Sequence, residues 1–206
     1  MPRTFAVTWD YRCPFARNAH EHLLAGLAGG ADWDVTYVPF SLGQVHVAEG
    51  EPPIWDRPDD DTGLWALRAG TVVRDRYPEV FPAVHRALFA VRHDLAQALK
   101  DPVVVTGVLS EHLDETQVNA VVDAVENGDA LAVVQKEHEA AADGPGVWGV
   151  PTFISGDRAV FVRVMDRNSG ETAEDRTRGQ RSIEHVLDLL DGFVELNEFK
   201  HTRIPR

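Results

Sequence analysis

The first forty residues constrain the fold most strongly, because they predict a strand, a helix and a second strand in close succession. Phe5–Trp9 is a short run that favours β-structure, and Trp33–Phe40 alternates in character with a period of two. Between them, Phe15–Leu27 carries apolar residues at helical spacing and stops at Gly29-Gly30. A crossover of this length favours parallel pairing of the two strands. The beginning of the chain therefore predicts an α/β fold.

A largely helical segment follows these elements. Gly43–Gly63 is polar and contains several prolines, so we expect a long, mobile loop near the site. Its acidic run, Asp59–Asp61, is more typical of a solvated turn than of a metal site. From Leu64 onward the pattern is helical almost throughout, and it predicts five helices: Leu64–Tyr77, Glu79–Leu99, Asp101–His112, Glu115–Glu126 and Asp129–Ala142.

The last part of the chain returns to strands. Thr152–Ser155 and Ala159–Val164 are predicted strands, and Gly156-Asp157 between them is typical of a tight hairpin. A polar, loop-like segment over 164–179 and an amphipathic helix over Gln180–Leu190 follow. The tail carries three large apolar residues, Phe193, Leu196 and Phe199.

This order of elements predicts two units. Residues 1–60 and 144–206 would form the α/β unit, and residues 61–143 would form an all-helical lobe inserted into it. A chain of 206 residues is long enough for such an arrangement and for a substantial core.

Charge and cysteine content limit the classes of function. The formal net charge is −13, which disfavours binding to nucleic-acid phosphates or to anionic membranes. No apolar run reaches the roughly 20 residues that span a bilayer, and the beginning is too short in apolar residues for a signal peptide. One cysteine allows no internal disulfide, so we expect a cytoplasmic protein. Its partners would then be small molecules, with a homodimer as a possible assembly.

The single cysteine, Cys13, lies where the first strand gives way to the first helix. Pro14 follows it, in the first helical turn where proline is favoured. Backbone N–H groups and the macrodipole at a helix start favour negative charge, so a thiol there tends to ionise. The placement indicates an enzyme built around one nucleophile.

Three segments resemble the DsbA-like class of thioredoxin-fold proteins, which carries a helical insertion. They are Asp10–Ala16 (Asp-Tyr-Arg-Cys-Pro-Phe-Ala), His85–His93 in the helical segment, and Gly146–Phe153 (Gly-Val-Trp-Gly-Val-Pro-Thr-Phe). The resemblance implies a thioredoxin fold with an inserted helical lobe. It also implies that Pro151 is cis and lies against Cys13, so that the exposed backbone of Val150 pairs with an extended substrate. The implied substrate- and thiol-binding residues are Pro14, Phe15, Trp148, Val150, Pro151 and Thr152.

The chain departs from the dithiol members of that class at Ala16. These members have a second cysteine there, which resolves the mixed disulfide. With alanine at this position, Cys13 would attack a disulfide or an electrophile, or be oxidised to sulfenic acid, and an external thiol would release it. Glutathione or mycothiol would serve as this low-molecular-weight thiol, with no metal. Arginine far outnumbers lysine, which hints at a GC-rich genome and weakly favours mycothiol.

Two other functions fit the same residues. One is a thiol-dependent isomerase or transferase that acts on an aromatic electrophile, a branch in which some members have serine in place of the cysteine. The other is a non-catalytic thioredoxin-fold binding module with a vestigial Cys13. We favour a monothiol oxidoreductase.

Several neighbouring residues have two interpretations each. Arg12 and Arg17 would lower the pKa of the thiol if they point inward, and are otherwise solvated. Aromatic residues around the two site segments belong to the core or line an apolar cleft, and two others would form its lid; the first group is Trp9, Tyr11, Phe15 and Trp148, and the lid pair is Trp55 and Trp65.

The histidines predict no metal site. His20 and His22 are more typical of packed or surface groups than of bases. His85, Arg92 and His93 share one helical stretch, where they would reach a thiol's carboxylate or form surface salt bridges. His138, in Lys-Glu-His-Glu, is typical of a solvated helix face.

Overall fold

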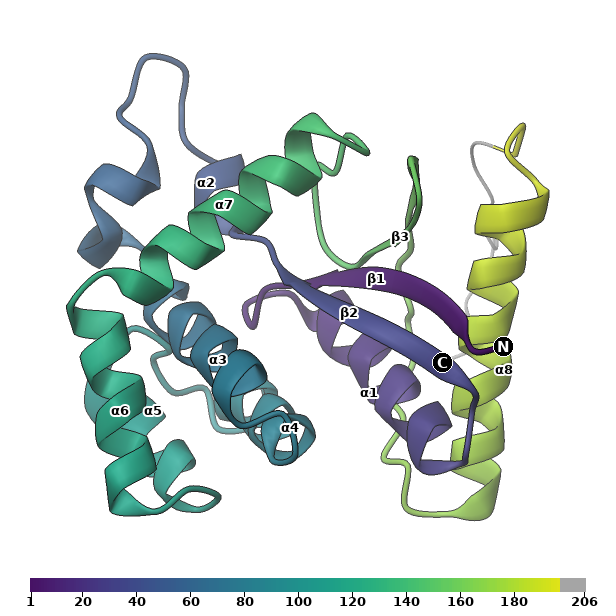
Figure 1. The fold of residues 1–206 in the computed structure, drawn as a ribbon, viewed down its shortest axis with the longest axis horizontal. Helices are drawn as coiled ribbons and strands as arrows, with labels where there is room; N and C mark the ends of the chain where they lie inside the picture. The colour runs from purple at the N-terminus through teal and green to yellow at the C-terminus, as the bar shows by residue number, and fades with distance from the viewer. Residues whose placement is uncertain (197–206) are drawn as a thin grey trace.

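A computed structural model describes residues 1–196 and contains one four-stranded sheet in the order β2-β1-β3-β4 (Figure 1). Its strands are β1 (Arg3–Trp9), β2 (Trp33–Pro39), β3 (Thr152–Ser155) and β4 (Arg158–Phe161). β1 pairs in parallel with β2 and antiparallel with β3, and β3 and β4 form an antiparallel hairpin. The parallel pairing expected of the first forty residues is confirmed. β1, which leads directly to Cys13, is thus a central strand.

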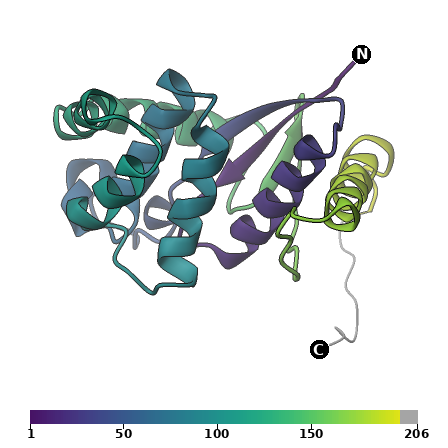
Figure 2. The ribbon, with the colours of Figure 1, turned by 90° about the horizontal axis from the view of Figure 1, so that it is seen from below.

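Two helices, α1 (Pro14–Ala28) and α8 (Ala173–Gly192), pack against each other beside the sheet (Figure 2). Their backbones approach so closely at Gly179 that an added Cβ would lie 2.6 Å from the carbonyl oxygen of His22. Glycine is therefore required at this contact. Apolar side chains of both helices and of the sheet form one core cluster, which includes Phe5, Val7, Leu23, Trp33, Phe153 and Ile183.

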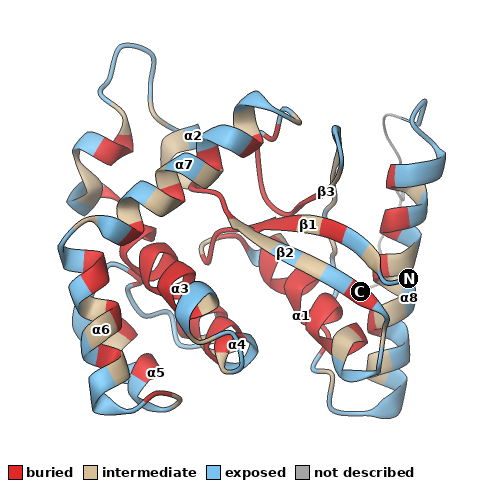
Figure 3. Ribbon diagram, in the orientation of Figure 1, coloured by how far each residue is buried: buried red, intermediate tan, exposed pale blue. Residues whose placement is uncertain are grey.

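The five helices of the insertion lie on the other side of the molecule (Figure 1). They are α3 (Leu64–Arg76), α4 (Phe81–His93), α5 (Pro102–Ser110), α6 (Glu115–Glu126) and α7 (Asp129–Asp143). α3 is buried over most of its length, and the other helices surround it (Figure 3). α7 also contacts β2, where Arg74 of α3 joins the carbonyl oxygen of Tyr37 to the carboxylate of Glu137. The second and larger core cluster includes both these helices and Cys13.

The connection before α3 is more ordered than a plain loop. It contains the short helix α2 (Leu42–Val45) and two 3-10 turns, Ile54–Asp56 and Pro58–Asp60. Among residues 1–196, no helix combines the length and the apolar character needed to cross a membrane.

Three predicted boundaries were wrong. α4 ends at His93 rather than at Leu99, because the chain turns there and Ala96 adopts a positive φ of 53°. β4 ends at Phe161, three residues early. α8 begins at Ala173, seven residues before the predicted start, where Thr172 and Asp175 form a capping box. Of the predicted apolar tail, Phe199 lies outside the described residues.

Candidate active site

Cys13 is the N-cap of α1, so its side chain takes the place where polar residues usually satisfy the first N–H groups of a helix. Its Sγ accepts a hydrogen bond from the N–H of Ala16 at 3.4 Å. The N–H of Cys13 donates to the carbonyl oxygen of Asp10 at 3.0 Å, which closes the turn between β1 and α1. Pro14 is the first helical residue and has no N–H to satisfy.

The segment before β3 lies against the thiol. The Val150–Pro151 bond is cis, as the resemblance implies. The Cys13 thiol donates to the carbonyl oxygen of Val150 at 3.3 Å. Thr8 of β1 fixes this segment, because its hydroxyl accepts from the N–H of Thr152 at 2.9 Å. The structure thus brings Cys13 and Val150 together from positions far apart in the sequence.

Burial governs the ionisation of the thiol. Only 8% of Cys13 is exposed, and desolvation raises its pKa above the ordinary value. The N–H groups of Ala16 and Phe15 and the charge of Arg163 lower the pKa, but by less than burial and Asp10 raise it. The expectation of an ionised thiol is therefore wrong for this structure. A neutral thiol agrees with its hydrogen bond to the Val150 carbonyl oxygen.

The two arginines considered as tuning groups bind carboxylates instead. Nε and Nη2 of Arg12 donate to Asp10, and Nη1 donates to Asp61 at 2.8 Å. All three guanidinium nitrogens of Arg17 likewise donate to carboxylates, those of Glu21 and Asp94.

The Arg12 contacts tie the polar loop to the site. Asp10 is fully buried and also accepts from the N–H of Leu42 at 2.8 Å. Asp61 accepts from the N–H groups of Gly63 and Leu64 at 2.7 and 2.6 Å, at the start of α3. Both ends of the loop are therefore held through one guanidinium group, so the loop expected to be mobile is anchored at the active-site turn.

The aromatic residues divide into core and surface. Trp9, Tyr11, Trp55 and Trp65 are buried, so the predicted lid formed by the last two is wrong. Trp148 is 63% exposed and stacks on Phe161 with ring centroids 4.5 Å apart. The guanidinium carbon of Arg163 lies 5.4 Å from the Phe15 ring centroid and 5.8 Å from that of Phe161.

Phe15, Trp148, Phe161 and Arg163 are here called the aromatic–arginine cluster. The sequence analysis missed Phe161 and Arg163, which carry no motif. Their place on the hairpin that follows Pro151 was the only available signal, because that hairpin returns along the Val150–Thr152 segment.

Three histidines are buried where the sequence suggested otherwise or left the matter open. The ring of His85, fully buried, accepts from Tyr11 Oη at 2.9 Å and lies 3.0 Å from His20 Nδ1. His20 Nε2 lies 3.1 Å from the carbonyl oxygen of Thr8. His85 can therefore neither bind a substrate carboxylate nor form a surface salt bridge. His138 is also buried and stacks on Phe40 at 4.0 Å, so its predicted solvated position is wrong.

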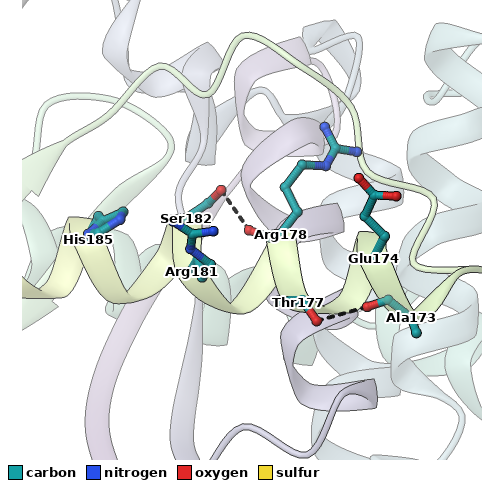
Figure 4. A pocket seen from close by; sticks show the side chains of 7 residues that line it. All are labelled: Ala173, Glu174, Thr177, Arg178, Arg181, Ser182 and His185. Carbon is teal, nitrogen blue, oxygen red and sulfur yellow. Dashed lines mark hydrogen bonds between the residues drawn. The ribbon is translucent and has the colours of Figure 1, made fainter.

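The remaining surface offers no second catalytic group. No cluster of three potential metal ligands occurs within residues 1–196. Figure 4 shows an open groove of about 630 Å³ along α8, lined by residues from Ala173 to His185. None of its lining residues contacts Cys13 or belongs to the aromatic–arginine cluster. The cysteine at the start of α1 is the candidate active site.

Comparison with known proteins relates the fold to one class. No known family pattern matches the chain, and no curated protein matches it in sequence. Three solved structures do match in shape, and all were obtained with low sequence identity. The cytosolic disulfide reductase DsbM from Pseudomonas aeruginosa, with GSH, has a TM-score of 0.60 at 14% identity, covering 90% of this chain and 100% of its own.

The other two extend the same comparison. Reduced DsbA1 from Neisseria meningitidis gives a TM-score of 0.57 at 16% identity, covering 92% of this chain and 84% of its own. A 2-hydroxychromene-2-carboxylate isomerase gives 0.54 at 15% identity, covering 90% and 96%. This chain therefore has the α/β thioredoxin fold with a helical insertion that is seen in DsbA-like proteins.

Proposed function

We propose that the protein is a thiol-dependent oxidoreductase that uses Cys13 alone, together with a low-molecular-weight thiol. The observation that carries the proposal is the position of Cys13 Sγ, at the start of α1 and 3.3 Å from the carbonyl oxygen of Val150. Ala16, one helical turn later, offers no second sulfur.

The reaction proceeds by thiol–disulfide exchange. Cys13 loses its proton and attacks one sulfur of a disulfide, so a new S–S bond forms to Cys13 and the second sulfur leaves as a thiolate. A low-molecular-weight thiolate then attacks the sulfur bound to Cys13 in the mixed disulfide. Cys13 leaves as a thiolate and is protonated again, and a new disulfide is released. The cycle needs no second cysteine and no metal.

The backbone of Val150 supplies a place for the substrate. Within residues 1–196, no hydrogen bond uses its N–H group. A substrate lying along Val150 would pair with this N–H and compete with Cys13 for the carbonyl oxygen. The solved structure of DsbM with GSH supports a thiol as co-substrate, and the same neighbour supports a cytoplasmic location.

A second function is favoured by one specific observation, the raised pKa of Cys13. In a thiol-dependent isomerase or transferase, a neutral Cys13 would donate its proton as a hydrogen bond to the sulfur of a bound thiolate, and that sulfur would attack the electrophile. The shape similarity to 2-hydroxychromene-2-carboxylate isomerase supports this alternative.

Intact mass measurement tests the first function. The native protein is incubated with glutathione disulfide or mycothiol disulfide, with the Cys13→Ser variant as the control. We expect one adduct on the native protein, removed by excess thiol, and none on the variant. Absence of any adduct on the native protein would reject the monothiol cycle.

The same variant separates the two functions. Serine keeps a hydrogen-bond donor at this position but cannot form a disulfide. Cys13→Ser should abolish reduction of a disulfide substrate completely. An isomerase or transferase would keep a measurable rate with added glutathione, and such a rate would favour the second function.

A further inference from the structure

We propose that Arg163 binds a carboxylate of the compound whose sulfur reacts at Cys13, so the co-substrate is an anionic thiol or its disulfide. The inference rests on the proposed function, since it names the class of molecule that the same site takes. It concerns a residue that neither the sequence motifs nor the hydrogen-bond network of the site identifies.

The first observation is the position of Arg163. After β4, the N–H of Val162 donates to the carbonyl oxygen of Pro151 at 3.1 Å, so this segment runs beside Val150–Thr152. Arg163 follows directly, and its guanidinium carbon lies 5.4 Å from the ring centroid of Phe15, two residues after Cys13. Its charge also acts on the thiol, because it lowers the Cys13 pKa.

The second observation is how the guanidinium group is held. It lies near two ring faces, those of Phe15 and Phe161, and Trp148 stacks on the second ring. Contacts with aromatic faces restrict a guanidinium group and leave its N–H edge available. That edge matches a carboxylate with two parallel hydrogen bonds.

The third observation is the absence of a carboxylate partner. The chain has 33 acidic residues, and several of its arginines hold carboxylates, among them Arg12, Arg17 and Arg74. In the described part of the chain, Arg163 takes part in no ion pair and no side-chain hydrogen bond. An exposed guanidinium group beside a reactive sulfur, in an otherwise acidic protein, is complementary to an anionic ligand.

The chemistry of the two thiols considered above then differs. Glutathione carries carboxylates at both ends, whereas mycothiol carries none. Binding of a carboxylate by Arg163 therefore favours a glutathione-type thiol and opposes the weak compositional preference for mycothiol. Trp148 and Phe161 would contact the uncharged part of the same ligand.

Binding of an unreactive ligand tests this inference without any redox step. S-methylglutathione cannot form a disulfide, and its diethyl ester lacks both carboxylates. Calorimetry would compare the two ligands on the native protein, on Arg163→Gln and on Arg158→Gln. Arg158 is exposed on the same hairpin and its side chain donates only to the Asp191 carbonyl oxygen, so this control matches the change in net charge.

We expect the native protein and Arg158→Gln to bind the acid about tenfold or more tightly than the ester, and Arg163→Gln to lose this preference. Arg163→Lys should restore only part of it, because lysine lacks the planar fork. An unchanged preference in Arg163→Gln, or no preference in the native protein, would overturn the inference.

A parallel incubation with glutathione disulfide separates the two proposals. A carboxylate preference that depends on Arg163, together with no adduct on Cys13, would reject the redox cycle and keep the ligand class. An adduct that forms at equal rates in the native protein and Arg163→Gln, with equal affinities in the calorimetry, would reject the ligand class and keep the cycle.

Discussion

Acidification should destabilise the fold through His20, and the structure sets the size of the effect. The hydrogen-bond chain has a fixed direction, because the Thr8 carbonyl oxygen can only accept. His20 Nε2–H must therefore donate to Thr8, and its Nδ1 must accept from His85 Nε2–H. Nδ1 of His85 then accepts from the Tyr11 hydroxyl. Both rings are neutral in the folded state.

Desolvation lowers the pKa of His20 to about 4. In the unfolded chain the pKa is about 6.5, so the unfolded state binds a proton first as the pH falls. The stability is complete above about pH 6.5 and decreases toward pH 4. At about 1.4 kcal/mol per pH unit, His20 alone costs roughly 2 kcal/mol at pH 5. His85, whose pKa is also lowered by burial, adds to the loss in the same direction.

Urea unfolding at pH 7 and pH 5, followed by tryptophan fluorescence, measures this loss. In the variant His20→Asn the amide oxygen can accept from His85 but nothing titrates. The difference between the two pH values should shrink by about 2 kcal/mol, while His185→Asn, at an exposed position, should leave it unchanged.

A full native-size loss in His20→Asn would refute this reasoning. Imidazole nitrogen NMR of the native protein gives an independent measurement that needs no variant. It should report a neutral His20 ring at pH 5, and a protonated ring there would be equally contrary.

Three further predictions concern the site. The rate of Cys13 alkylation by iodoacetamide should still rise with pH above the range of a free cysteine, because burial raises the thiol pKa; a plateau near pH 7 would contradict this. Arg12→Ala should lower the free energy of unfolding by about 3–5 kcal/mol in thermal or urea unfolding, because Asp10 remains buried without its partner. A loss below about 1 kcal/mol would show that water replaces the guanidinium group. Trp148→Ala should leave the melting temperature within about 2 °C, because this side chain is mostly exposed, yet weaken S-methylglutathione binding severalfold; unchanged binding would remove Trp148 from the ligand site.

Much of the fold follows from local pattern. The strand–helix–strand beginning, the helix over Glu115–Glu126 and the strand over Thr152–Ser155 were predicted from periodicity and capping residues, and the structure has them. The start of α8 was missed because its first two turns are polar and exposed, so no apolar period marks them. Only the Thr172–Asp175 capping box indicated that start.

The histidines show a different limit. A histidine in a charged or amphipathic helix has the same local sequence whether it faces water or the core. His85 and His138 are buried because α4 and α7 turn those faces toward Tyr11 and Phe40, which lie far away in the sequence. No local pattern carries that information.

The ionisation of Cys13 depends on two opposing effects, of which the sequence reveals only one. The strand-to-helix junction and Pro14 indicate N–H groups that stabilise a thiolate, and the structure contains that contribution. The opposing effect is desolvation by Val150 and by the core cluster, together with the negative charge of Asp10. It exists only when distant segments come together. A ligand carboxylate at Arg163 would also weaken the positive field that favours the thiolate, so a redox cycle requires the bound substrate to supply compensating contacts to the sulfur, and Val150 is the backbone placed to organise them.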